Sequence, residues 1–263
     1  MKSALSIIVI AGLAASANAQ IFNPANATIT DSNAVFTLGN NTSGASGNGP
    51  TSTFSVTGPG GASNSAAAWW WVRVDGANTR ENAVYQPTAV VSNPAGNELR
   101  IVYNYTSFQL TLRFTVSGFD AGFGALTQTA TIRNSSGGAL SFNLFNYMDV
   151  NAGGNTTNVA SITGPNTADF SDGFTTATYE ASNALRIDTT NNVRGLLTNN
   201  SIDNLSGGTI NSLGDLEVAA QFAFTLPNNG VQTVSTTLTV IPTPGAAALL
   251  GVGGLVAFRR RRA

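Results

Sequence analysis

Apolar and polar residues alternate with a period of two along most of the chain between residues 20 and 240. The clearest segments are 108–116 and 216–226, where an apolar residue occupies every second position. Such a pattern is typical of strands that bury one face and expose the other. The same reading applies to Ala27–Leu38, Thr51–Thr57, Ala68–Val74, Ala83–Ser92, Glu98–Tyr105, Thr127–Asn134, Leu140–Tyr147, Thr175–Glu180, Ala184–Asp188 and Val234–Val240.

Residues typical of turns separate these segments. Asp75-Gly76 and Asn228-Asn229-Gly230 tolerate positive φ, and the body between the two ends has no helical spacing. Roughly a dozen or more strands without helical connections predict an all-β fold, a large antiparallel β-sandwich of the jelly-roll or mutarotase-like kind. A barrel or two small sandwiches are the alternatives. Gly39–Pro50 and Asn191–Gly214 are interpreted as long loops on one domain, residues 20–240.

The composition excludes several kinds of chemistry. The chain contains no Cys and no His, and 10% of its residues are charged. Without these two residue types there is no disulfide, no thiol nucleophile, no Ser-His-Asp arrangement and no zinc-finger site. Without disulfides, stability must come from the size of the core.

The basic residues are concentrated at the two ends of the chain. Lys2 is the only lysine, and four of the eleven Arg residues are the last ones before Ala263. The middle region keeps seven Arg residues against all thirteen acidic residues, a net charge of −6. Because nucleic-acid binding depends on clustered basic residues, we expect no nucleic-acid partner.

Residues 1–19 have the pattern of a secretory signal peptide, predicted as a short helix. Lys2 precedes an apolar run at residues 4–15, and Ala17 and Ala19 form an Ala-x-Ala cleavage site for signal peptidase. An uncleaved membrane anchor is the alternative, although the apolar run is short for a membrane span. Cleavage after Ala19 predicts an exported protein.

The C-terminal segment, residues 241–263, combines three features in order. They are a Pro-rich segment, an apolar run and an Arg cluster: Pro242, Thr243, Pro244 and Gly245; residues 246–258; and Arg259, Arg260, Arg261 and Arg262. Proline ends the preceding strand, the apolar run predicts a short transmembrane helix that holds weakly, and the arginines stay on the cytoplasmic side. The tail is therefore predicted to tether the protein transiently. A persistent single-pass anchor is the alternative.

This tail resembles the PEP-CTERM sorting domain, the signal carried by substrates of the bacterial exosortase system. Pro242 and Pro244 match the Pro-Glu-Pro pattern of the family, whereas Thr243 stands where Glu is usual. The resemblance implies that an exosortase-like enzyme recognises the tail and cuts it near these residues. It also implies a location at the cell surface or in an extracellular polysaccharide matrix. It says nothing about the body.

All three tryptophans of the chain are consecutive, Trp69, Trp70 and Trp71. In a strand the first and third share one face, and the second lies on the other. One face is expected to be core. The other is a candidate platform for the apolar face of a sugar ring, and the alternative is a strand buried on both sides.

Two Asp/Asn-rich segments are candidates for calcium. Asp149 and Asn151 open a segment with oxygen ligands at alternate positions and Gly at the sixth, but Ala160 stands where a closing acid would be needed. Asp169 and Asp172 form a second cluster of hard oxygen ligands. Asp and Asn are also common turn residues, so no cofactor is expected apart from calcium at these segments.

No catalytic motif stands out in the body, so the sequence favours a protein that is not an enzyme. The main hypothesis is an exported structural or interaction protein at the cell surface or in the matrix. The alternative is a carbohydrate-binding sandwich that uses the Trp69–Trp71 strand. A glycosidase with two carboxylates is a third hypothesis, since that chemistry needs no His.

Overall fold

The fold is described from a computed structural model of the chain, which describes residues 27–39, 50–58, 63–76, 80–85, 89–119, 122–190, 192–208 and 212–242. The predicted signal peptide, with Ala17 and Ala19, lies outside the described residues. So do the tail beyond Pro242 and its predicted transmembrane helix. Within the described part, no helix is long and apolar enough to cross a membrane.

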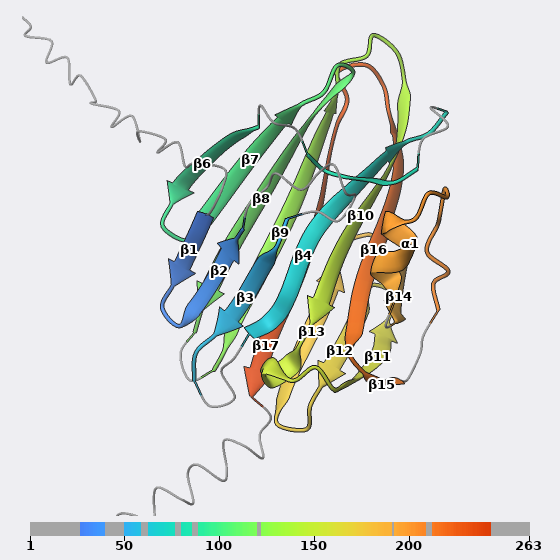
Figure 1. Cartoon of the computed structure of the whole chain (residues 1–263). Coiled ribbons are helices and arrows are strands. Elements are labelled where there is room, and N and C mark those ends of the chain that lie inside the picture. Colours follow the sequence, from blue (N-terminus) through green and yellow to red (C-terminus); the bar gives the residue numbers. More distant parts are fainter. Residues whose placement is uncertain are drawn as a thin grey trace, which may run out of the picture.

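The first of two sheets has eight strands among the described residues (Figure 1). Neighbouring strands in it are antiparallel. Its order is β1 (Ala27–Asp31), β2 (Ala34–Leu38), β3 (Ser52–Val56), β4 (Ser63–Val74), β10 (Leu140–Val150), β16 (Leu216–Leu226) and β14 (Arg186–Thr190), with β5 (Asn82–Ala83) paired to β4.

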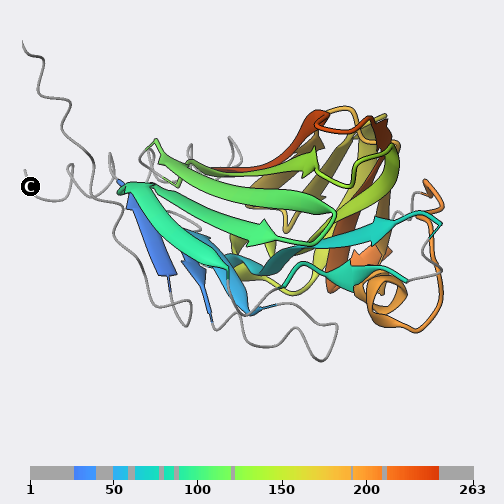
Figure 2. The ribbon, with the colours of Figure 1, turned by 90° about the horizontal axis from the view of Figure 1, so that it is seen from above.

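The second sheet has nine strands in the described part, again antiparallel. Figure 2 shows β1 to β4 on one side of the core and the green strands of the second sheet on the other. The prediction of an antiparallel β-sandwich is confirmed. The order of the second sheet is β15 (Ser212–Gly214), β11 (Asn158–Gly164), β12 (Thr167–Ser171), β13 (Thr175–Ala181), β17 (Val231–Pro242), β9 (Gly124–Asn134), β8 (Phe108–Gly118), β7 (Glu98–Asn104) and β6 (Val90–Ala95).

The alternating apolar and polar residues of the sequence correspond to alternating buried and exposed positions in the second sheet. Along β8 the apolar residues are buried and the polar ones between them are at least partly exposed. Threonines dominate the exposed face of β9 and β17, where Thr127 and Thr237 lie 3.2 Å apart and Thr131 and Thr233 2.9 Å apart, hydroxyl to hydroxyl. β-branched residues fit a pleated, half-buried surface, so this composition suits a sheet with one wet face.

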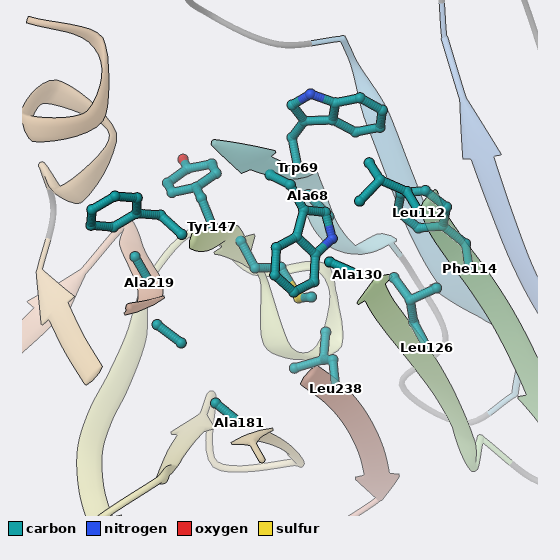
Figure 3. Packing of buried hydrophobic residues seen from close by; sticks show 14 of the residues in the cluster. Ala68, Trp69, Leu112, Phe114, Leu126, Ala130, Tyr147, Ala181, Ala219 and Leu238 are labelled. Atoms are coloured by element: carbon teal, nitrogen blue, oxygen red, sulfur yellow. The ribbon is translucent and has the colours of Figure 1, made fainter. Parts of the chain in front are cut away.

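The first sheet differs because β4 and β10 are buried on both faces. Trp69 stacks on Phe114 of β8 with ring centroids 5.8 Å apart, and Trp70 stacks on Phe222 at 6.0 Å. Figure 3 shows this part of the core, with Trp69 and Ala68 from the first sheet near Phe114 and Leu112 from the second. The core is continuous across both sheets.

Several elements differ from the sequence prediction. Ala27–Leu38 is not one strand but the hairpin β1–β2, whose turn places Ser32 at a φ of 49°. The predicted loop Asn191–Gly214 contains a short helix, α1 (Val193–Thr198), and the strand β15. The helix forms there because Val193 and Leu197, one turn apart, are both buried. The strands β11 and β12 and the short 3-10 helix η2 (Ala152–Gly154) were not predicted.

Candidate functional site

The tryptophan strand is not the surface platform that the sequence suggested as one alternative. Trp69, Trp70 and Trp71 are each at most 1% exposed. The indole Nε1 of Trp69 donates to the carbonyl of Val84 at 3.0 Å, and Trp71 packs edge-to-face on Tyr147. Because a sugar cannot reach any of these rings, the reading of a strand buried on both sides is the correct one.

Two of the four calcium candidates, Asp169 and Asp172, accept hydrogen bonds from neighbouring residues. The Asp172 carboxylate accepts the backbone N–H groups of Phe174 and Thr175 at 2.8 and 2.7 Å and thus closes a tight turn. Asp169 accepts the Thr178 hydroxyl at 2.7 Å. Asn151 lies beyond the end of β10, at the start of η2. Within the described residues, no group of three or more acidic side chains is placed to hold a metal ion.

A polar hollow on the first sheet is the strongest candidate site. It has a volume of about 430 Å³ and is built on β4, β10, β16 and β14, with the segment 199–208 beside it. We call it the polar pocket. Its lining residues are Arg73, Asp75, Asn143, Leu185, Arg186, Asn204, Gln221 and Ala223.

Strand register explains why these side chains meet. Asn143 on β10 is paired with Arg73 on β4 and with Ala223 on β16, and Arg186 on β14 is paired with Gln221. Cross-strand partners point to the same face of a sheet, so four strands contribute side chains to one surface. The sequence signal for this site is a set of polar residues, Arg73, Asn143 and Gln221, within otherwise largely apolar strands.

Arg73 is the centre of the pocket wall. Its side chain is 6% exposed, and its guanidinium is paired with the buried Glu81 and, at 3.3 Å, with Asp75. It also donates to the carbonyl of Asp203 at 2.6 Å and to Oδ1 of Asn204 at 2.8 Å, and it lies over the Phe145 ring at 5.6 Å. A buried guanidinium with this many acceptors is held in one orientation.

The amides of the pocket are fixed in the same network. Asn143 donates to both carboxylate oxygens of Asp75, at 2.9 and 3.0 Å. Gln221 donates to Asn143 at 2.8 Å and to Asn204 at 2.7 Å, and its own oxygen accepts the Leu205 N–H at 3.0 Å. The Asp75 side chain is 46% exposed, so a carboxylate held by two neighbours faces the pocket.

A second polar cluster lies at the far end of β10. Asp149 and Glu217 are directly opposite each other on β10 and β16, and the Tyr147 hydroxyl donates to Glu217 at 2.8 Å. Burial, reinforced by Asp215 and Glu217, raises the pKa of Asp149 to about 6, and burial also raises the pKa of Tyr147. Asp149 and Glu217 are thus a cross-strand pair of acidic residues, whereas Asp75 is the one carboxylate among the lining residues of the polar pocket.

The fold and the pocket define a large antiparallel β-sandwich with a polar pocket on one sheet. No protein-family model matches the chain, and no curated protein matches it in sequence. Among solved structures, it is similar to a candidate aldose 1-epimerase from Escherichia coli K12, with a TM-score of 0.46, 9% identity and coverage of 82% of this chain and 99% of the other. A candidate kojibiose phosphorylase from the human microbiome matches with a TM-score of 0.40 and 10% identity, over 84% of this chain and 26% of the other.

These neighbours correct one expectation. The missing catalytic motifs favoured a protein that is not an enzyme, yet both neighbours are described as enzymes of sugar chemistry. The prediction that the protein is not an enzyme is therefore withdrawn. At these identities the likeness is one of fold alone.

Proposed function

We propose that the polar pocket binds carbohydrate. The observation that carries the proposal is the fixed network of one carboxylate, three amides and a guanidinium around a hollow of about 430 Å³. Sugar hydroxyls both donate and accept, so they are recognised by amides and carboxylates whose orientation is set before binding. Such pre-organisation reduces the entropy lost when the ligand binds.

The charges of the pocket favour a neutral sugar there. Arg73 is already paired with Glu81 and Asp75, so its charge is compensated within the wall. Asp75 is partly exposed and has lone pairs left for hydroxyl donors. Arg186, which also lines the pocket, donates to the carbonyl of Leu205 at 2.6 Å. The charges of Arg73, Arg186, Asp75 and Glu81 sum to zero, which suits a neutral ligand.

Carbohydrate binding should depend on the side chains that line the polar pocket. We expect Asp75→Ala and Asn204→Ala to lose the signal that the full chain gives on an array of neutral oligosaccharides. Glu180→Ala, which removes an exposed carboxylate on β13, is the matched control and should keep it. An array without any hit, or hits that survive both pocket variants, would remove the proposal.

We propose that the sandwich has the mutarotase-like form. A jelly roll has eight strands in total, whereas the two sheets here have eight and nine strands among the described residues. This size supports the mutarotase-like form over the jelly-roll form.

We also propose that the protein is exported and then sorted through its C-terminal tail. The support is the order of features in the sequence, a cleavable signal at residues 1–19 and the Pro-Thr-Pro segment, apolar run and Arg cluster at residues 241–263. A chain truncated before Pro242 should mature and localise differently from the full chain. Identical fates of the two chains would refute the sorting role.

A further inference from the structure

A second hollow borders β4 on the side opposite the polar pocket. Successive residues of a strand point to opposite faces, so Arg73 lines the polar pocket while Val72 and Val74 line a cavity of about 340 Å³. A neighbouring cavity of about 200 Å³ shares Tyr105 and Phe108 with it. We call the two together the Tyr105 groove. Its other lining residues are Asn82, Ala83 and Tyr85 on one side and Asn104, Gln109, Arg133, Ser135 and Asn229 on the other.

The aromatic base of the groove is held firmly. Tyr105 stacks on Phe108 with centroids 4.4 Å apart and an interplanar angle of 20°, and Phe108 packs edge-on against Phe142 at 5.3 Å. The Tyr105 hydroxyl donates to the carbonyl of Tyr85 at 3.4 Å and accepts its N–H at 3.3 Å. Burial raises the pKa of Tyr105 to about 12, so this side chain stays neutral. The ring is therefore a rigid surface and not a mobile side chain.

The two sides of the groove differ in chemistry. One side is mainly apolar, with Val72, Val74 and Ala83. The other is polar, and there the Gln109 amide donates to Asn104 at 2.7 Å. A groove with a flat aromatic base, an apolar side and an amide side matches a pyranose ring, which has an apolar C–H face and a rim of hydroxyls.

Arg133 gives the groove an uncompensated positive charge. It is exposed at the end of β9, opposite Gln109 on β8 and Val231 on β17. It makes no hydrogen bond or ion pair with the described residues, and the described lining of the groove contains no carboxylate. This contrasts with Arg73, whose guanidinium is paired within the wall of the polar pocket.

We propose that the Tyr105 groove is a second binding site, for a pyranose that carries a carboxylate, such as a uronic acid residue. The C–H face of the sugar packs on Tyr105, its hydroxyls meet Asn104 and Gln109, and its carboxylate pairs with Arg133. The site uses different residues from the polar pocket and does not depend on the function proposed for it.

The test is an NMR titration of the full chain at low salt with two probes, methyl β-D-glucuronide and the neutral methyl β-D-glucoside. We expect the glucuronide to shift the signals of Asn104, Gln109 and Arg133 and to bind about threefold more tightly than the glucoside, as an exposed ion pair provides. Arg133→Gln should abolish this preference. Arg100→Gln, which changes another exposed arginine outside the groove, is the control and should keep it.

The aromatic contribution is tested separately. Tyr105→Ala should weaken both probes by roughly tenfold. Tyr105→Phe keeps the ring and should stay within about twofold, which covers the case in which the alanine variant does not fold. Equal binding of the two probes, a preference that survives Arg133→Gln, or no binding would overturn the proposal. Asp75→Ala should leave these signals unchanged, so this site and the polar pocket fail or succeed independently.

Discussion

At the scale of single residues, Arg73 links the fold to the candidate site. Its guanidinium is buried against Glu81 and Phe145 while its neighbours Asp75 and Asn204 line the pocket. The buried charges of Arg73 and Glu81 are tolerated because they form an ion pair. The remaining N–H groups of Arg73 donate to a backbone carbonyl and to an amide oxygen. The geometry of the pocket therefore depends on an ion pair behind it.

Removing one member of this ion pair should lower the stability of the folded protein. Glu81→Ala leaves the Arg73 charge buried without its buried partner, and we expect a loss of about 3 kcal/mol in the free energy of unfolding. Urea unfolding measures the change. Arg113→Ala is the control, because Arg113 pairs with Glu98 at 2.5 Å but is 54% exposed, and it should cost less than about 1 kcal/mol. Equal effects of the two substitutions would contradict this account.

Asp149 makes a prediction about pH. Its pKa is raised to about 6, mainly by burial, so the folded chain holds a proton that the unfolded chain loses near pH ~4. Stability should then fall as pH rises from about 4 to about 6 and level off above that. Asp149→Asn removes this loss. Because Asp149 is partly exposed, we expect the substitution to raise the free energy of unfolding by only about 1 kcal/mol at neutral pH. Near pH ~4 the two proteins should be about equally stable. A gain that is the same at both pH values would refute the assignment.

At the scale of elements, β4 shows what periodicity can and cannot reveal. Alternation predicted a strand at Ala68–Val74, and β4 includes it. Whether its second face is wet depends on what covers it, and Val84, which accepts the Trp69 indole N–H, is 15 residues away in the sequence. The pocket depends on contacts of still longer range, such as Arg73 to Asn204, 131 residues apart. No local pattern encodes such pairings, and so the Trp platform was wrong and the polar pocket was missed.

The burial of the tryptophan strand can be measured by fluorescence. Because all three rings are buried, acrylamide should quench the native emission weakly and the unfolded emission strongly. Trp70→Ala should also cost about 3–5 kcal/mol, as large-to-small changes in a packed core do. A portion of native emission quenched as readily as in urea would show that one ring is exposed after all.

The short η2 element makes a separate prediction about backbone geometry. Gly153 has a φ of 63°, and a Cβ there would lie 2.4 Å from Oδ2 of Asp172. Gly153→Ala should therefore destabilise the protein by more than about 1 kcal/mol. Gly96→Ala is the matched control, since a Cβ at that position meets nothing within 4 Å. Thermal unfolding of both variants decides the matter, and equal melting temperatures would be inconsistent with this geometry.

At the scale of the whole molecule, the few charged side chains distinguish the two candidate sites. The acidic middle region, with a net charge of −6, keeps its buried arginine paired at the polar pocket and an unpaired arginine at the Tyr105 groove. The alternation of apolar and polar residues predicted the class of fold, and the composition excluded His and Cys chemistry. Neither feature could place the hollows. The polar pocket lies between strands of the first sheet and the segment 199–208, and the Tyr105 groove is lined by strands of both sheets.

The most direct measurement is a ¹H–¹⁵N NMR titration of the full chain with a neutral oligosaccharide selected on the array, following the side-chain signals that line the polar pocket. The carbohydrate-binding account predicts saturable shifts of the Asn143, Asn204 and Gln221 amides and of the Arg73 Nε–H, all lost in Asp75→Ala. Saturable shifts confined to other parts of the sandwich, with these four signals unmoved, would contradict it.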